Sequence, residues 1–109
     1  MELLQKEVVL EALQQFIGKH AYLHVEVNPG AYLRNSKVQI SSVYVLGDNP
    51  YRIFLQFDGG QALLQMDNVT HMLVTQDIVI ATGYDEYGRL ARTIEISLTP
   101  FDVVGGNNG

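Results

Sequence analysis

The feature that most constrains this sequence is a change in the spacing of its apolar residues after Gly18. Between residues 3 and 17, apolar side chains recur every three or four positions, which is the period of an amphipathic helix. From Ala21 onward apolar and polar residues alternate, as in strands buried on one face. One helix followed only by strands argues against repeated strand–helix–strand units. The predicted fold class is therefore mainly β, of the α+β type, with an N-terminal helix.

Turn residues divide the rest of the chain into strands joined by hairpins. Asp58-Gly59-Gly60 separates two short alternating segments, and Gly88 suits a left-handed position in the connection that begins at Asp85. Asn28-Pro29-Gly30 is a further turn. The predicted strands cover residues 21–27, 32–46, 51–57, 61–66, 71–75, 77–84 and 89–98.

The segment from residue 32 to residue 46 is too long for one flat strand. Ser41-Ser42 interrupts its alternation, so we expect a bulge or bend there that lets the segment pair in two sheets. The predicted architecture is a coiled, bifurcated antiparallel sheet with barrel-like curvature, preceded by the helix.

Composition limits the domain organisation and the kinds of partner. The 109 residues suit one globular domain at residues 1–104, followed by a disordered tail, GGNNG, at 105–109. There is no cysteine, which excludes disulfides and thiolate chemistry. The net charge is -5 and the seven Lys and Arg residues are scattered, so we expect neither nucleic acid nor a membrane as partner. The charged N-terminal segment does not resemble a signal peptide, which predicts a cytoplasmic protein.

The stretch YLHVEV, residues 22–27, places His24 and Glu26 on one strand face. Side chains two apart on a strand lie about 7 Å apart, so both can reach one metal ion if a neighbouring strand adds a third ligand. No second His-containing pair completes a zinc motif, and we assign no metal and no cofactor. The more frequent use of such a pair is a structural hydrogen-bond network, with Glu26 paired to Arg34 or Arg52.

Two arginines and a tyrosine complete the candidate ligand-binding set. Arg34, in YLRN, can bind either Glu26 or an anionic ligand. Arg52 lies in the apolar strand PYRIFLQF, where a buried charge needs a partner, and Tyr51 precedes it. The candidate ligand-binding residues are His24, Glu26, Arg34, Tyr51 and Arg52. We assign no catalytic residue, because the sequence has neither a GxSxG nucleophile motif nor a glycine-rich phosphate loop.

Four segments in order, AYLHVEV, GAYLRNSKV, NPYRIFLQFDGG and ISLTPFDV, resemble the YojF-like family of small uncharacterised proteins from Bacillus and its relatives. The resemblance covers Ala21 to Val103 and implies a soluble cytoplasmic protein with an N-terminal helix and coiled, bifurcated sheets. Members are often encoded beside a bacillithiol-pathway deacetylase, which implies an accessory role. The family pattern has a longer polar stretch between its HVE-like and AYLRN-like segments, where this chain has only residues 27–30.

The leading functional hypothesis is a non-catalytic binding or assembly module, with a neighbouring enzyme as a possible protein partner. The alternative is a small enzyme or metal-binding protein that uses His24 and Glu26 with Arg34. We also expect a homodimer, because the helix has a broad apolar face and several strands have two apolar sides.

Overall fold

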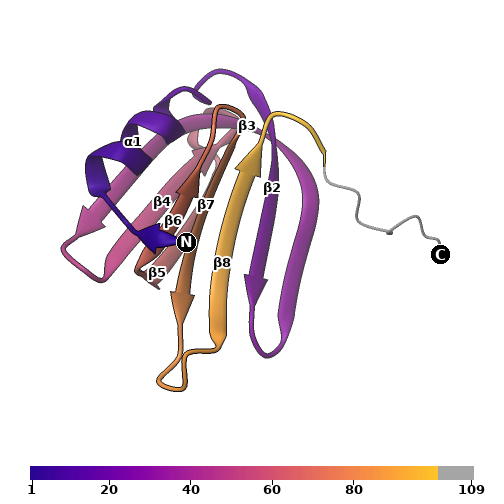
Figure 1. Cartoon of the computed structure of the whole chain (residues 1–109). Coiled ribbons are helices and arrows are strands. Elements are labelled where there is room, and N and C mark those ends of the chain that lie inside the picture. The colour runs from indigo at the N-terminus through magenta and orange to yellow at the C-terminus, as the bar shows by residue number, and fades with distance from the viewer. Residues whose placement is uncertain (101–109) are drawn as a thin grey trace.

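The structure is a computed structural model that describes residues 1–100, and the protein is mainly β, as predicted (Figure 1). All paired strands are antiparallel, and they form one sheet with the order β1-β6-β7-β8-β2-β3-β4-β5. In chain order the elements are β1 (Glu2–Leu3), α1 (Lys6–Gln14), β2 (His20–Val27), β3 (Ala31–Gly47), β4 (Tyr51–Phe57), a 3-10 turn (Asp58–Gly60), β5 (Ala62–Val69), β6 (His71–Val74), β7 (Ile78–Tyr84) and β8 (Leu90–Ser97).

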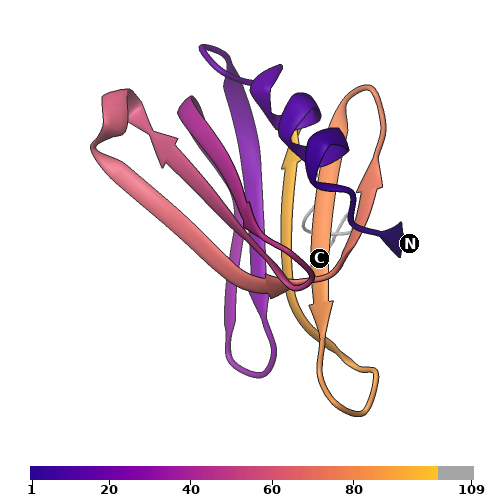
Figure 2. The same ribbon diagram turned by 90° about the vertical axis from the view of Figure 1, so that its left-hand side faces the viewer.

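Strand β3 bends and belongs to two arms of one sheet. Its first part pairs with β2 as far as Gln39, and its second part pairs with β4 from Ile40 onward. The register shifts between Ile40 and Ser42, at the predicted break. We call β1, β6, β7, β8, β2 and the first part of β3 the first arm; the rest of β3 with β4 and β5 forms the second arm. Figure 2 shows the two arms diverging.

The sheet is not closed into a barrel, so the predicted barrel-like architecture is wrong. The strand order ends at β1 and β5, and these two edges do not pair with each other within residues 1–100. Only Thr70 separates β5 from β6, and its N–H donates to the carbonyl of Thr82 at 2.8 Å. Beside this corner, Nη1 of Arg92 donates to the carbonyl of Asn68 at 3.1 Å. This side-chain hydrogen bond joins β8 of the first arm to the end of β5 in the second arm.

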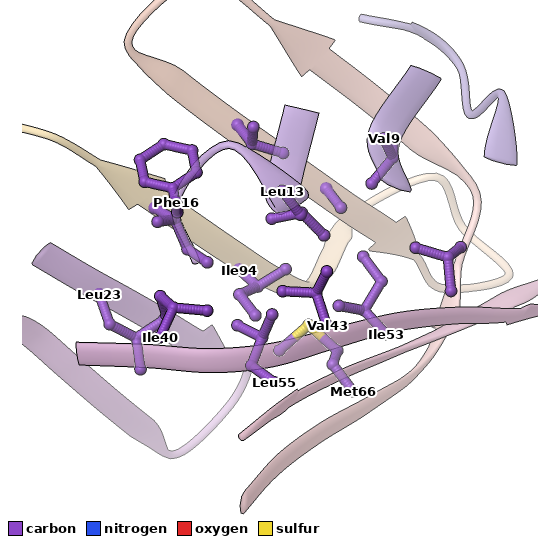
Figure 3. Close-up of a cluster of buried hydrophobic side chains, with 14 of the residues drawn as sticks. Val9, Leu13, Phe16, Leu23, Ile40, Val43, Ile53, Leu55, Met66 and Ile94 are labelled. Carbon is purple, nitrogen blue, oxygen red and sulfur yellow. The ribbon is translucent and has the colours of Figure 1, made fainter. Parts of the chain in front are cut away.

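Helix α1 begins later than the predicted residue 3, because residues 2–3 pair with β6 as strand β1, and it ends at Gln14 and not at residue 17. Val9 and Leu13, on one side of α1, are fully buried between the arms (Figures 2 and 3). The chain leaves the helix through a turn in which Phe16 stays in the core and Gly18 has a φ of +81°. Burial of this helix face fixes the relative position of the two arms.

A single hydrophobic core extends from Leu4 to Ile96 and includes side chains from both arms, so residues 1–100 form one unit. The predicted domain end at residue 104 and the predicted tail at 105–109 lie outside the described residues. Among residues 1–100 no helix has the length and apolar character needed to span a membrane.

Candidate functional site

Strand β8 completes the strand face that carries His24 and Glu26. Glu95 lies directly opposite His24, and Thr93 lies directly opposite Glu26. Opposed residues of antiparallel strands point to the same face of the sheet, so these four side chains form two adjacent rows. We call His24, Glu26, Thr93 and Glu95 the polar block. Figure 1 shows β2 and β8 side by side in the first arm.

Apolar neighbours along the same strands hold the polar block in place. Leu23 on β2 and Ile94 and Ile96 on β8 are buried in the core, with exposed fractions of 2, 3 and 1%. Because side chains alternate along a strand, burial of these residues turns the intervening polar residues to the opposite face. The alternation predicted for YLHVEV is therefore present in β2, with Leu23 facing the core and His24 facing the opposite side.

His24 and Glu26 lie close together and are partly withdrawn from solvent. Nε2 of His24 is 3.8 Å from Oε1 of Glu26, and the two side chains are 16 and 22% exposed. Nδ2 of Asn28 donates to Oε2 of Glu26 at 2.7 Å. The Glu26 carboxylate is thus held between an imidazole and an amide, which fixes its orientation.

The other two members of the polar block are less favourably solvated. Burial raises the pKa of Glu95, and the charge of His24 opposes this shift. Thr93 is 8% exposed, and its hydroxyl has no hydrogen-bond partner among the described residues. A buried hydroxyl without a partner loses free energy relative to water, so this atom lowers the stability of the fold.

A β-bulge in β3 lies opposite His24. Leu23 pairs with Ser36 and Val25 with Leu33, so Arg34 and Asn35 together face the single residue between. Asn35 has a φ of +51°, as one bulge residue often does. Bulges are frequent beside functional sites because they redirect side chains.

The predicted ion pair between Glu26 and Arg34 is not formed among the described residues. The guanidinium carbon of Arg34 instead lies 4.8 Å from the ring centroid of Tyr32, which pairs with Glu26 across the strands. The side chain of Arg34 is exposed, and the bulge moves it out of the regular alternation. Arg34 therefore stands beside the polar block without contacting its carboxylates.

Tyr51 and Arg52 lie in the second arm, on β4, apart from the polar block. The side chain of Arg52 is 60% exposed, and its Nε is 3.9 Å from Oδ1 of Asp67. Arg52 is thus not the buried charge that the sequence suggested, and it is not the partner of Glu26. The five candidate residues fall into two places, with only His24 and Glu26 in contact.

A hollow of about 490 Å³ lies at the ends of the β2–β3 and β7–β8 hairpins. Asn28 belongs to its wall and also donates to the carbonyl of Leu90 at 3.2 Å, so one side chain joins the hollow to Glu26. Asp85 accepts hydrogen bonds from the backbone N–H groups of Tyr87 and Arg89, which lower the pKa of its carboxyl. The lining residues are Asn28, Pro29, Gly30, Tyr32, Asp85, Arg89 and Leu90.

Sequence reasoning missed Asn28, Thr93 and Glu95. Thr93 and Glu95 are two apart in a predicted strand, so their shared face was readable from the alternation. Their placement opposite Glu26 and His24 depends on which strand neighbours β2, and that pairing joins residues about seventy positions apart. Within residues 1–100, no group of three or more His, Asp or Glu side chains is placed to hold a metal ion.

Comparison with known proteins yields a family and a solved structure. A family model described as protein of unknown function (DUF1806) matches residues 27–101. The crystal structure of the Bacillus subtilis YojF protein is similar, with a TM-score of 0.83 and 27% sequence identity, over 92% of this chain and 95% of that one. No curated protein matches the chain. The resemblance to YojF-like proteins is thereby confirmed.

Proposed function

The chain belongs to the family described as protein of unknown function (DUF1806), and on this premise we propose that it is a non-catalytic binding module whose site is the polar block. The supporting observation is the His24–Glu26 pair, which is held 3.8 Å apart and only 16 and 22% exposed. Charged groups on a sheet face that serves only solubility usually extend fully into water. Strands β2 and β8 provide a rigid support for these groups, as binding sites require.

Contacts of the hydroxyl groups favour binding over nucleophilic catalysis. Ser42 donates to the side chain of Gln56, and Ser97 donates to the carbonyl of Thr99. Nδ1 of His71 contacts the hydroxyl of its neighbour Thr70. These hydroxyls lack the geometry of a nucleophile activated by a histidine that a third group orients.

We further propose that the protein acts in the cytoplasm as a homodimer and as an accessory to a neighbouring enzyme, such as the bacillithiol-pathway deacetylase implied by the YojF-like resemblance. Support for association comes from the second arm, where Tyr44 and Leu63 are 50 and 58% exposed on one face. Strand β5 is an edge of the sheet, and exposed edges favour pairing with another chain. Light scattering of wild type and Leu63→Lys tests the dimer: a wild-type mass of one chain at micromolar concentration contradicts it.

The rival function is a small enzyme or metal-binding protein that uses His24 and Glu26 with Arg34. One observation favours it: an imidazole beside a carboxylate is the arrangement of a general base, and Arg34 lies on the facing bulge. Turnover of any substrate by the purified protein, abolished by His24→Ala, would establish this rival. Elemental analysis without stoichiometric metal removes its metal-binding form.

The test of the binding module is a thermal-shift comparison of wild type with His24→Ala/Glu26→Ala. Both are scanned with divalent metals, a chelator, and thiol and amino-sugar metabolites. A control variant, His20→Ala/Glu86→Ala, removes the same two residue types from exposed positions. We expect a ligand that raises the melting temperature of wild type and control but not of the site variant, because only binding to the native state stabilises. Equal shifts in all three proteins would show that the ligand binds elsewhere.

A further inference from the structure

The hollow at the hairpin ends is held in shape by hydrogen bonds between its two hairpins. Figures 1 and 2 show the β2–β3 and β7–β8 hairpins projecting from the same end of the first arm. The backbone N–H of Asn28 donates to the carbonyl of Ala91 at 2.9 Å, and its Nδ2 donates to the carbonyl of Leu90 at 3.2 Å. The walls are therefore fixed relative to each other, around a volume of about 490 Å³ that is typical of small-molecule sites.

Arg89 is the cationic residue of the hollow, and the fold restrains its side chain at two places. Its Nε donates to Oδ2 of Asp85 at 2.9 Å, and its guanidinium carbon lies 5.0 Å from the ring centroid of Tyr87. Asp85 is itself held by the backbone N–H groups of Tyr87 and Arg89, which donate to its Oδ1 at 2.8 and 2.9 Å. An arginine that is already restrained loses less side-chain entropy when it binds a ligand.

The terminal nitrogens of Arg89 are available to a ligand. The side chain is 73% exposed, and within residues 1–100 only its Nε donates a hydrogen bond. Nη1 and Nη2 lie in one plane, and together they match the two oxygens of a carboxylate. Asp85 thus orients the guanidinium through Nε and leaves this pair of donors unused.

Several of the other lining residues offer apolar surface. Pro29, Tyr32 and Leu90 line the hollow, and Tyr32 and Leu90 are 60 and 36% exposed. The rings of proline and tyrosine are flat, and an aromatic ring packs favourably against such surfaces. The guanidinium carbon of Arg34, 4.8 Å from the ring centroid of Tyr32, adds a positive charge beside this wall. The hollow thus combines apolar surface with cationic donors.

We propose that this hollow binds a small aromatic carboxylic acid, with the carboxylate on Nη1 and Nη2 of Arg89 and the ring against Tyr32 and Pro29. The hollow is a second site, and its ligand does not depend on the function proposed for the polar block. A carboxylate fits better than a phosphate, because Asp85 beside Arg89 repels a dianion more strongly than a monoanion.

The experiment titrates the wild-type protein with four probes and follows backbone amide shifts by NMR. The probes are benzoate, benzamide, acetate and phenyl phosphate. Benzamide keeps the shape of benzoate without its charge, and acetate keeps the charge without the ring. We expect benzoate to shift the amides of residues 28–32 and 85–90 and to bind about tenfold more tightly than benzamide or acetate. Phenyl phosphate should bind more weakly than benzoate.

Each other outcome overturns a defined part of the proposal. If benzoate does not shift these amides, the hollow is not its site and the proposal fails. Equal affinity for benzamide would show that the charge is not recognised, and equal affinity for acetate would show that the ring makes no contact. Tighter binding of phenyl phosphate would show that the carboxylate assignment is wrong.

Three variants assign the contacts: Arg89→Gln, Arg89→Lys and Tyr32→Ala. Loss of the guanidinium charge should weaken benzoate binding about tenfold, and Arg89→Lys, which keeps the charge without the paired donors, about fivefold. Tyr32→Ala should weaken it about fivefold through loss of ring contact. The control is Lys37→Gln, an exposed residue of β3, which removes one positive charge and should change the affinity by less than about twofold. Equal weakening in Lys37→Gln and Arg89→Gln would overturn the proposal, because only net charge would then attract benzoate. Unchanged amide spectra outside the two hairpins establish that each variant is folded.

Discussion

Replacement of Thr93 by valine should make the free protein more stable. The two side chains have nearly the same shape, so the substitution exchanges a hydroxyl for a methyl group and leaves the packing of β8 in place. The Thr93 hydroxyl is buried and has no partner within residues 1–100. An unmatched buried polar group costs about 1–3 kcal/mol, and the methyl group does not carry this cost. We expect a gain in the free energy of unfolding of about 1 kcal/mol, the lower end of that range.

Urea denaturation followed by circular dichroism measures this gain. The midpoint should rise while the slope of free energy against urea stays the same, because the surface exposed on unfolding is unchanged. For a chain of this size, 1 kcal/mol corresponds to a rise in melting temperature of about 4 °C. Ser97→Ala is a control of opposite sign: the hydroxyl of Ser97 donates to the carbonyl of Thr99, so its loss should destabilise by about 1 kcal/mol.

A loss of more than about 0.5 kcal/mol in Thr93→Val would refute the reasoning, since it would show that the hydroxyl makes a hydrogen bond in the free protein.

Three further predictions concern single side chains. A Cβ on Gly83 would lie 2.1 Å from the carbonyl of Asn68, so Gly83→Ala should destabilise by about 1–3 kcal/mol. Gly88→Ala is its control, with open space but a φ of +77°, and should cost about 1 kcal/mol in the same urea assay. Burial raises the pKa of Glu95 in the folded protein, so ionisation of this carboxyl removes stability as the pH rises from 4.5 through the folded-state pKa. Glu95→Gln should therefore have a higher melting temperature than wild type at pH 7 and the same melting temperature at pH 4. Hydrogen bonds from the backbone lower the pKa of Asp85, so this carboxylate stabilises the wild type above pH 3.8 and the stabilisation is lost on acidification. Asp85→Asn should lack this stabilisation, so melting scans across pH should show a smaller loss on acidification than in wild type.

Local signals predicted the strands of this fold well. The turn at residues 58–60 and the left-handed Gly88 lie where glycine makes a hairpin possible, and β4 begins and ends as predicted. Ser41-Ser42 marked the bend of β3 because an interrupted alternation is visible in the sequence itself. These features depend on residues near one another in the chain.

The errors concern contacts between distant residues. The helix was predicted to begin at residue 3, but residues 2 and 3 pair with β6, about seventy positions later. A barrel-like sheet was predicted, yet the edge strands β1 and β5 do not pair with each other within residues 1–100. Arg34 moved out of the expected ion pair because of a bulge, whose position depends on the register of β2 and β3.

The candidate site was also predicted only in part, and the missing part again depends on contacts between distant residues. His24 and Glu26 were recognised because they are two positions apart in one predicted strand, and this spacing is visible in the sequence. Glu95 and Thr93 were not linked to them, because no local sequence pattern predicts that β2 pairs with β8. Arg52 was included because a charge in an apolar strand was expected to be buried, but β4 carries it and Tyr51 into the other arm.

The single-residue link between β5 and β6 determines where this chain tolerates changes in length. One residue inserted at Thr70 would shift β6 by one position against β7, and a shift of one turns every side chain of a strand to the opposite face. Met72 would leave the core and His71 would enter it. The turn at residues 28–30 is bound by no such register, since its glycine has open space and a hairpin end can lengthen outward. Insertions and deletions among relatives should therefore gather at the β2–β3 turn and be absent from the β5–β6 corner.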